Sequence, residues 1–274
     1  MNVRGRHFEV VGHRGSGHQP ENTMSAFKQG VKDGADRIEF DIRRTAEGHY
    51  VVMHDRELDR TTNGTGNVDE VTLDYIQTLD AGDGAPPPTF QQVIDWSKAE
   101  DVALDIEIKA GESDEIVEIL EEADLKKPWV KSFEHGLIAE IEEARPELVT
   151  GVLVKPKAML YRLGLGAALG AAAAAVAGPF LGVGALLAAG VGAGLGLLAG
   201  YERGTDATFD QSFNNKSDIA MPHHRLVTKR MTRRAEECGR TVVPWTVDRP
   251  KDGERLKKKG VAGIITNFPD LFRV

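Results

Sequence analysis

Two acidic residues, Glu39 and Asp41, alternate with apolar residues in the segment 37–43. If this segment is a strand, residues i and i+2 point to the same side, so the two carboxylates share one face. Carboxylates gathered on one face are costly unless a positive group neutralises them, and Mg²⁺ and Ca²⁺ prefer carboxylate oxygen. Glu39 and Asp41 are therefore candidate metal ligands. Salt bridges to Arg37 and Arg43 on a solvated strand face are the alternative.

A second segment, Ile106-Glu107-Ile108-Lys109, repeats the alternation of charged and apolar residues. Glu107 and Lys109 share a face of this predicted strand, as does Asp105. A simple ion pair is one interpretation of a Glu beside a Lys. At the mouth of a catalytic barrel, Glu107 would instead be a third metal ligand and Lys109 would hold a phosphate.

Two histidines follow predicted strands. His13 and Arg14 stand in Gly12-His13-Arg14-Gly15, directly after an apolar run, and His54 stands before Asp55 at the end of another. An imidazole titrates near neutrality, and a guanidinium offers a planar fork to two phosphate oxygens. Each pair taken alone could equally belong to a solvated loop. Their meeting at one barrel mouth, with the carboxylates, favours a catalytic site.

Strands and helices that could position these residues alternate along the chain. Amphipathic helical patterns at residues 113–123, 136–144 and 228–238 lie between short apolar runs, an alternation that indicates parallel βα units. The length of 274 residues is typical of a single (β/α)₈ barrel. The predicted strands are residues 8–12, 37–43, 50–53, 102–108, 129–133, 149–154, 219–221, 241–246 and 263–266.

One connection differs from the rest. The turn Ala46-Glu47-Gly48 leaves no room for a crossover helix between residues 37–43 and 50–53, so these strands should form an antiparallel hairpin. Residues 56–89 are polar and rich in Gly, Asp and Pro. We interpret them as an excursion between barrel units and not as a separate domain.

Composition limits the partners and the compartment. The net charge is −8 and the pI near 5.6, which disfavours generic nucleic-acid binding because phosphate contacts need clustered Lys and Arg. The single cysteine, Cys238, excludes an internal disulfide. Residues 1–10 lack the apolar core of a signal peptide. We therefore expect the barrel to lie on the cytoplasmic side.

Residues 163–200 contain only Leu, Gly, Ala, Val, Phe and Pro. Gly178-Pro179 divides this segment into halves that, with their flanks, approach the length needed to cross a bilayer. Strands on either side must join one barrel, so an even number of crossings is required. We predict an apolar helical hairpin, residues 158–203, that associates with the cytoplasmic face of the cell membrane. A soluble helical pair used for homo-oligomerisation, or a flexible loop in a cytoplasmic protein, is the alternative.

The chain resembles the glycerophosphodiester phosphodiesterase family in residues 8–157 and 218–271. The motifs that carry the resemblance are His13-Arg-Gly, Pro20-Glu-Asn-Thr23, Gly34-Ala35, Glu39-Phe-Asp41, Val51-Val-Met-His-Asp55, Ile106-Glu-Ile-Lys109, Ser132-Phe133, Trp245-Thr-Val247 and Gly263-Ile-Ile-Thr266, in that order. The resemblance implies a TIM-type (β/α)₈ barrel formed by residues 1–157 and 204–274. It does not extend to the apolar insertion.

The resemblance also implies an activity and roles for site residues. The activity is the hydrolysis of glycerophosphodiesters to sn-glycerol 3-phosphate and an alcohol, with one divalent ion, Mg²⁺ or Ca²⁺. By position, the metal ligands are Glu39, Asp41 and Glu107, the general acid/base pair is His13 and His54, the phosphate-binding residues are Arg14 and Lys109, and Trp245 lines the glycerol side. Asn267 and the turn at residues 46–48 depart from the family's usual residues. The nucleophile is either the glycerol 2-hydroxyl or water.

Three other functions fit parts of the sequence. A lysophospholipase D-like enzyme would use the apolar insertion to reach a lipid-derived substrate at the membrane surface. An inactive barrel could serve as a membrane-bound scaffold. A phosphotriesterase-like hydrolase would need several histidine ligands, and only the pair His223-His224, after a predicted strand, is near enough to a barrel mouth to be considered.

Overall fold

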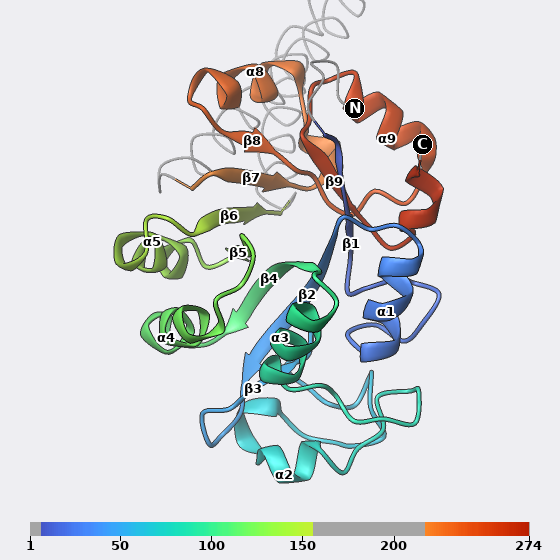
Figure 1. The fold of residues 1–274 in the computed structure, drawn as a ribbon, viewed down its shortest axis with the longest axis vertical. Coiled ribbons are helices and arrows are strands. Elements are labelled where there is room, and N and C mark those ends of the chain that lie inside the picture. Colours follow the sequence, from blue (N-terminus) through green and yellow to red (C-terminus); the bar gives the residue numbers. More distant parts are fainter. Residues whose placement is uncertain (1–6, 156–216, 274) are drawn as a thin grey trace, which may run out of the picture.

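The structure, a computed structural model, describes residues 7–155 and 217–273, and their strands form one barrel (Figure 1). The strands are β1 Glu9–Gly12, β2 Arg37–Arg44, β3 Tyr50–Val52, β4 Ala103–Ala110, β5 Trp129–Ser132, β6 Val149–Val154, β7 Ile219–Pro222, β8 Thr241–Val242 and β9 Gly263–Thr266. The predicted strands are confirmed, except that β8 is shorter than residues 241–246.

Eight of these strands are parallel and follow one another around the barrel. Their order is β8-β7-β6-β5-β4-β2-β1-β9. Backbone hydrogen bonds join the two ends of this sheet. Ala262 donates to Val242 O at 2.9 Å, and Ile265 donates to Pro244 O at 2.9 Å. The barrel is therefore nearly closed, and the predicted TIM-type (β/α)₈ architecture is confirmed.

Strand β3 is the exception in direction. It pairs antiparallel with β2, with Ile42 opposite Val52 and Arg44 opposite Tyr50. The predicted hairpin is confirmed. Residues 56–89 then leave the barrel and contain only the short elements η1 (Val68–Glu70) and α2 (Leu73–Ile76) before the chain re-enters at α3. They form an excursion beside the barrel, as the sequence predicts.

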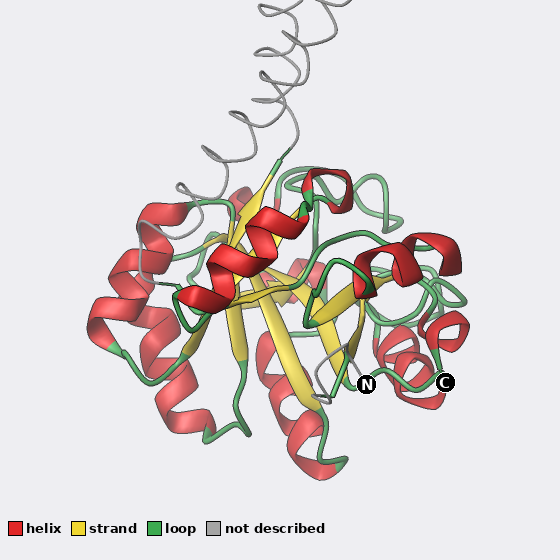
Figure 2. Ribbon diagram, turned by 90° about the horizontal axis from the view of Figure 1, so that it is seen from above, coloured by secondary structure: helices red, strands yellow, loops and turns green. Residues whose placement is uncertain are grey.

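Helices surround the strands (Figure 2). Four of the described α-helices begin at a threonine whose side-chain oxygen accepts a backbone N–H in the first turn: Thr23, Thr72, Thr89 and Thr228. The α-helices α4, α5 and α9 have no side-chain cap. The helices are α1 Met24–Lys32, α3 Phe90–Ala99, α4 Ser113–Ala123, α5 His135–Ala144, α8 Lys229–Glu237 and α9 Pro250–Lys257, with the 3₁₀ segments η2 His224–Leu226 and η3 Pro269–Phe272.

The main core lies between strands and helices, and β2 shows how the sequence divides its two faces. Ile38, Phe40 and Ile42 point outward into this core and are fully buried. Glu39 and Asp41 alternate with them and are also buried, at 1 % exposure. Because strand side chains alternate between faces, these two carboxylates lie inside the barrel.

The apolar insertion predicted for residues 158–203 lies outside the described residues, as does the boundary of the domains on either side of it. In residues 7–155 and 217–273, no helix is both long and apolar enough to cross a membrane.

Candidate active site

The predicted site residues come together at the carboxyl ends of the barrel strands. His13 and Arg14 follow β1, Glu39 lies on β2, His54 follows β3, and Glu107 and Lys109 lie on β4. All of them line one cavity of about 420 Å³, counted together with its open mouth. The other lining residues are Lys131, Phe133, Leu153, Trp245, Thr246 and Ile265. Catalytic sites of parallel barrels lie at this end of the strands.

Three carboxylates meet beside this cavity. One oxygen each from Glu39, Asp41 and Glu107 lie within 4.8 Å of one another, and all three residues are buried. Strand pairing explains this, because Asp41 on β2 lies opposite Glu107 on β4. Oδ1 of Asp41 is buried and accepts no hydrogen bond. A buried carboxylate oxygen that accepts no hydrogen bond, among three convergent carboxylates, fits a divalent cation.

Two cations lie against the carboxylates. Nζ of Lys109 contacts Glu107 and lies 3.2 Å from Oδ1 of Asp41, and Nε of Arg14 lies 3.3 Å from Oδ2 of Asp41. Burial alone would raise the pKa of Asp41, but Lys109 and Arg14 outweigh it and hold that pKa well below its usual range. The ion pair predicted for Glu107 and Lys109 is present, and it lies inside the site.

Glu107 titrates differently from Asp41. Burial and the nearby charge of Asp41 raise the pKa of Glu107 to about 7, although Lys109 opposes them. Burial, together with repulsion from Asp41, therefore brings the titration of Glu107 close to neutrality. A cation bound between them would relieve this repulsion.

Salt bridges to Arg37 and Arg43 do not explain the acidic pair of β2. Arg37 donates to Leu104 O at 2.8 Å and pairs with Glu9 at 3.4 Å, at the opposite end of the strand. Arg43 donates to His54 O at 2.9 Å. A solvated strand face is therefore the wrong interpretation, because Glu39 and Asp41 are buried inside the barrel.

The backbone at Arg14 is bent towards the site. Arg14 has φ 54°, a conformation that is rare outside glycine, and its N–H donates to Oε2 of Glu39 at 2.8 Å. Its guanidinium donates to Glu21 at 2.8 Å. A residue in such a conformation must be stabilised by its surroundings. For Arg14 the hydrogen bond to Glu39, a candidate metal ligand, provides this stabilisation.

The ring of His13 is oriented through an asparagine. Nδ1 of His13 lies 2.7 Å from Oδ1 of Asn267, whose own Nδ2 donates to Asp248 at 2.8 Å. Because a carboxylate accepts only, Asn267 must turn its oxygen to His13, and Nδ1 of His13 must carry the proton. Nε2 is then the nitrogen left for proton transfer. Asn267 fills this role although the family usually has Asp at its position.

His54 is held by its neighbour in sequence. Its Nδ1 lies 2.6 Å from Oδ1 of Asp55, and Asp55 also accepts from Arg60. Burial lowers the pKa of His54, and the charge of Asp41 opposes that shift only in part. The Arg60 guanidinium continues to Glu21 at 2.6 Å, so a chain of ion pairs links the surroundings of His54 to those of Arg14.

Two residues in contact with the carboxylates were not singled out from the sequence. Lys131 on β5 is 1 % exposed and lies 2.7 Å from Asp105 and 3.2 Å from Glu39. Asn22, with φ 59°, donates to Asp41 at 2.9 Å. The signal for Lys131 was available, because a lysine in the middle of a predicted strand, with Trp129 and Phe133 on the same face, needs a buried partner.

Aromatic residues form the opposite wall. Trp245 lines the cavity as predicted, its Nε1 donates to Met221 O at 2.7 Å, and its ring packs edge-to-face on Phe133. His223 packs against the other side of Trp245, outside the cavity lining. The His223-His224 pair therefore supports the aromatic wall, and the structure offers no histidine cluster of the phosphotriesterase type among the described residues.

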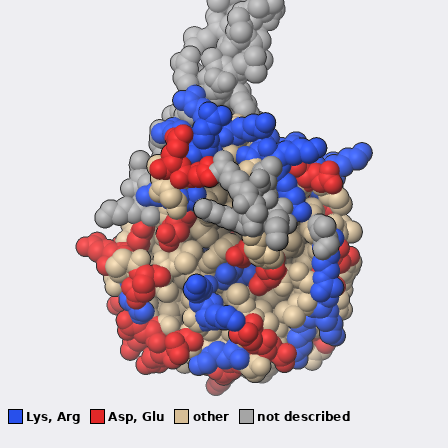
Figure 3. All heavy atoms as spheres, turned by 45° about the horizontal axis from the view of Figure 1, so that its top comes forward, with Lys and Arg blue, Asp and Glu red and all other residues tan. Residues whose placement is uncertain are grey.

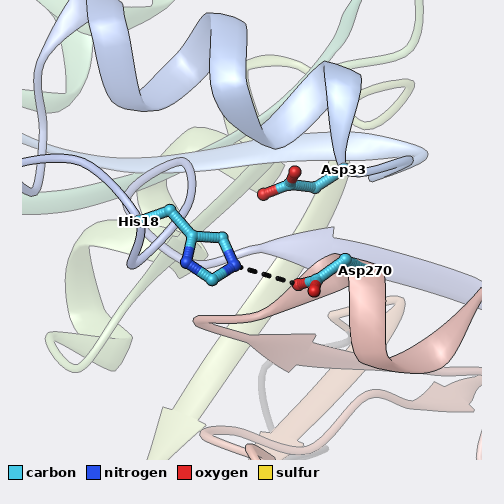
Figure 4. A group of neighbouring side chains, drawn as sticks. All are labelled: His18, Asp33 and Asp270. Atoms are coloured by element: carbon cyan, nitrogen blue, oxygen red, sulfur yellow. Dashed lines mark hydrogen bonds and ion pairs between the residues drawn. The ribbon is translucent and has the colours of Figure 1, made fainter.

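A second group with metal-binding side chains lies away from this cavity (Figure 4). It contains His18, Asp33 and Asp270, and His18 lies 3.4 Å from Asp270. Both oxygens of Asp33 already accept hydrogen bonds, from Ser16 at 2.6 Å and Gln29 at 2.7 Å. Oδ1 of Asp41, in contrast, is buried and accepts no hydrogen bond. The site on β2 and β4 is therefore the better candidate for a metal.

The fold and the site together define a TIM-barrel hydrolase of phosphoric diesters. The model of the glycerophosphoryl diester phosphodiesterase family matches residues 13–271, and the chain belongs to this family. A glycerophosphodiester phosphodiesterase of Caldanaerobacter subterraneus subsp. tengcongensis is 29 % identical over 276 residues, 95 % of this chain and 94 % of the relative. One from Bacillus subtilis is 29 % identical over 290 residues, 96 % of this chain and 84 % of the relative.

A solved structure shares the fold. The phosphodiesterase of Oleispira antarctica in complex with the product sn-glycerol-3-phosphate superposes with a TM-score of 0.70 at 19 % identity, covering 96 % of this chain and 95 % of that one. The predicted family is thus confirmed. The roles assigned to individual residues stay predictions.

Proposed function

We propose that the chain hydrolyses glycerophosphodiesters to sn-glycerol 3-phosphate and an alcohol by general acid/base catalysis. The convergence of three buried carboxylates, two histidines and two cations on one cavity is the observation that carries this proposal. Family membership supports the substrate class and favours it over lysophospholipids.

We infer that Glu39, Asp41 and Glu107 hold one divalent ion, and that Mg²⁺ and Ca²⁺ are the candidates because all three ligands are carboxylates. When bound, such an ion supplies positive charge for the phosphoryl oxygens. The donor set contains no thiolate or imidazole, which are the ligands that would favour zinc.

Arg14 and Lys109 act on the phosphate itself. A phosphodiester carries a negative charge that repels nucleophiles, and charge grows on its oxygens during displacement. The Arg14 fork and the Lys109 ammonium border the cavity and are already anchored by Glu21 and Glu107, so they offset this charge without being reorganised first. Trp245 and Phe133 provide an apolar wall for the glycerol carbons.

The two histidines move the protons. In each ring Nδ1 is engaged, by Asn267 in His13 and by Asp55 in His54, which leaves Nε2 to exchange a proton with the substrate. One histidine takes the proton of the nucleophile, and the other protonates the departing alkoxide. The nucleophile is the glycerol 2-hydroxyl or water, and detection of a cyclic glycerophosphate by ³¹P NMR would identify the first.

The test is turnover of glycerophosphocholine by His13→Ala and His54→Ala, with Mg²⁺ or Ca²⁺ supplied in turn. We expect each variant to lose about 10²–10⁴ in kcat, as is usual for a general acid or base. His7→Ala is the control, because His7 pairs with Asp36 before β1, at the far end of the barrel. Wild-type turnover by either site variant, with a folded protein by circular dichroism, would contradict the assignment.

We also propose that the chain associates with the cytoplasmic face of the cell membrane through the apolar residues 163–200. The support is their composition, since none of their side chains is charged or forms hydrogen bonds. Homo-oligomerisation through this segment is the competing proposal, and light scattering of the detergent-free protein separates the two.

A further inference from the structure

Charge is distributed unevenly over the molecule. Residues 217–273 contain thirteen Lys and Arg against seven Asp and Glu, although the whole chain has a net charge of −8. Figure 3 shows the consequence, with lysines and arginines gathered at the top of the view and acidic side chains more frequent lower down. The positive region belongs to the last third of the barrel, which contains α8 and α9 (Figure 1).

Part of this positive region borders the catalytic mouth. In a parallel barrel the helices run back along the strands, so their first turns lie at the same end as the active site. The exposed cations at this end are Arg225 in η2, Lys229, Arg230 and Arg233 in the first half of α8, and Arg249 and Lys251 at the start of α9. We call these six residues the basic rim.

Short links tie the basic rim to the active site. Arg225 stands two residues after His223, whose ring packs on Trp245 of the cavity wall. Arg249 follows Asp248, which orients Asn267 and through it His13. Asp252 pairs with Arg249 at 3.1 Å and neutralises part of its charge. The six cations of the rim still outnumber the neighbouring acids Asp248 and Asp252.

Helix stability does not explain the cations of α8. The positive end of the helix dipole lies at the N-terminus, where acidic residues stabilise and basic residues destabilise. Helix α8 has no acidic residue in its first turn, begins with Lys229 and Arg230, and has Glu236 and Glu237 at its end. Lys257 and the two lysines after it, in contrast, lie at the end of α9, where the dipole favours them.

We propose that the basic rim docks this mouth of the barrel on an anionic lipid bilayer. Charge complementarity favours such a surface, because clustered Lys and Arg are attracted to anionic headgroups. The chain also leaves the barrel for the apolar residues 163–200 from Lys155, at the end of β6 and thus at the same mouth. The net charge of −8 disfavours nucleic acid as the partner. Docking concerns binding alone and does not depend on the proposed catalytic roles.

The experiment compares the full chain with the variant Lys229→Glu/Arg233→Glu. Sedimentation is measured with vesicles of phosphatidylcholine alone and of phosphatidylcholine mixed with phosphatidylglycerol. We expect the wild type to prefer the anionic vesicles and to lose that preference at high salt. Loss of two rim cations should weaken binding to anionic vesicles by about 30-fold, because each contributes about 1 kcal/mol near such a surface, and the two new carboxylates should weaken it further.

The design separates docking from misfolding and from substrate capture. Acidic residues near the start of α8 suit its dipole, so the variant should melt no lower than the wild type. Lys28→Glu/Lys32→Glu on α1 is the matched control, with the same spacing, exposure and charge change outside the basic rim, and it should keep its vesicle binding.

Three results would overturn the proposal. The first is equal binding of the wild type to neutral and anionic vesicles. The second is a rim variant that binds anionic vesicles like the wild type but has a lower kcat/KM for soluble glycerophosphocholine, because the rim would then serve the free substrate. The third is tighter binding to a nucleic-acid duplex than to anionic vesicles at the same salt.

Discussion

At the scale of single residues, the interior of the barrel is dominated by buried charge. Lys131 lies between Asp105 and Glu39 and is fully enclosed. Burial alone would lower the pKa of this lysine, but the two carboxylates outweigh it and raise the pKa. Lys131 therefore stays charged, and it offsets the buried negative charge of Asp105 and Glu39.

Removal of this ammonium should be costly. We expect Lys131→Met to lower the free energy of unfolding in urea by about 3–5 kcal/mol, because it leaves uncompensated buried charge. Asp105→Asn in the same chain should restore part of the loss. Lys126→Met is the matched control, since its pair with Asp101 is exposed at 70 % and 76 % and should contribute less than about 1 kcal/mol. Equal effects of the two lysine variants would contradict the role of Lys131.

His224 makes folding sensitive to acid. Burial, followed by the neighbouring His223, lowers the pKa of His224 to about 4, and its buried Nδ1 has no hydrogen-bond partner. In the unfolded chain the imidazole of His224 takes up a proton near pH 6.5, whereas in the folded chain it stays neutral down to about pH 4. The contribution of His224 to stability is therefore complete above about pH 6.5 and is lost as the pH falls towards 4.

His224→Gln should therefore reduce the loss of stability between pH 7 and pH 5, measured by urea unfolding at both values. His224 is only partly buried, and solvent screens its charge. We therefore expect the change in unfolding free energy to be smaller than its full pKa shift would give. His49→Gln, in the exposed turn of the β2–β3 hairpin, should leave the pH dependence unchanged. The same loss in all three proteins would refute this.

At the scale of elements, the turn from β1 into α1 positions Arg14 by close packing. Gly15 has φ +93°, and a Cβ built on it would lie 2.4 Å from the carbonyl carbon of Ala26 in α1. Neither the backbone conformation nor the space permits a side chain. The loop therefore lies directly on the helix, which fixes the direction in which Arg14 enters the site.

Gly15→Ala should push this loop away from α1. We expect kcat for glycerophosphocholine to fall by about 10², because a displacement of about 1 Å at a positioning residue has effects of that size. Gly84→Ala is the control. Gly84 also has a positive φ, +81°, but nothing lies within 4 Å of its Cβ position, so it measures the backbone strain alone. Equal activity of the two variants would show that the close packing of Gly15 does not position the site.

The sequence predicted most elements because each follows from local periodicity. Alternation in residues 37–43 and 102–108 predicted both the strands and the shared face of Glu39, Asp41 and Glu107. The partners of these residues were harder to predict. Lys131 contacts Glu39, 92 positions before it, and Asn267 contacts His13, 254 positions before it. Such contacts depend on barrel closure, which no local pattern encodes.

The short β8 has a similar explanation. Residues 243–246 belong to the predicted strand because most of them are apolar, and Ile265 of β9 does donate to Pro244 O and accept from Val247. Pro222 of β7 lacks a backbone N–H, however, so it cannot donate to this segment and the regular ladder with β7 stops, although Trp245 still donates to Pro222 O at 3.2 Å. A single residue therefore ends the strand that its neighbours would extend.

At the scale of the whole molecule, the barrel is complete without the apolar segment. Strands β6 and β7 pair directly, with Gly151 opposite Ile219 and Val154 opposite Pro222. Residues 163–200 interrupt the connection between these two strands, and the described residues on both sides already form the cavity and its lining. Catalysis and membrane association should therefore be separable.

Deletion of residues 163–200 tests this separation. Residues 156–162 and 201–216 would remain between β6 and β7, and a chain of that length reaches about 70 Å when extended, several times the length of a strand. We expect the barrel to close and kcat/KM for glycerophosphocholine to stay within about twofold of wild type, because the deletion leaves every described residue of the cavity lining in place.

Membrane fractionation of the same variant then resolves the two contributions to binding. Apolar insertion resists salt, whereas attraction between the basic rim and anionic lipid is screened over about 10 Å at 0.1 M salt. The full chain should stay with membranes after a high-salt wash, and the deletion variant should be released by it while still binding at low salt. An inactive or aggregated deletion variant would mean that the segment is part of the folded barrel, and a wild type found wholly in the soluble fraction would end the proposal of a membrane anchor.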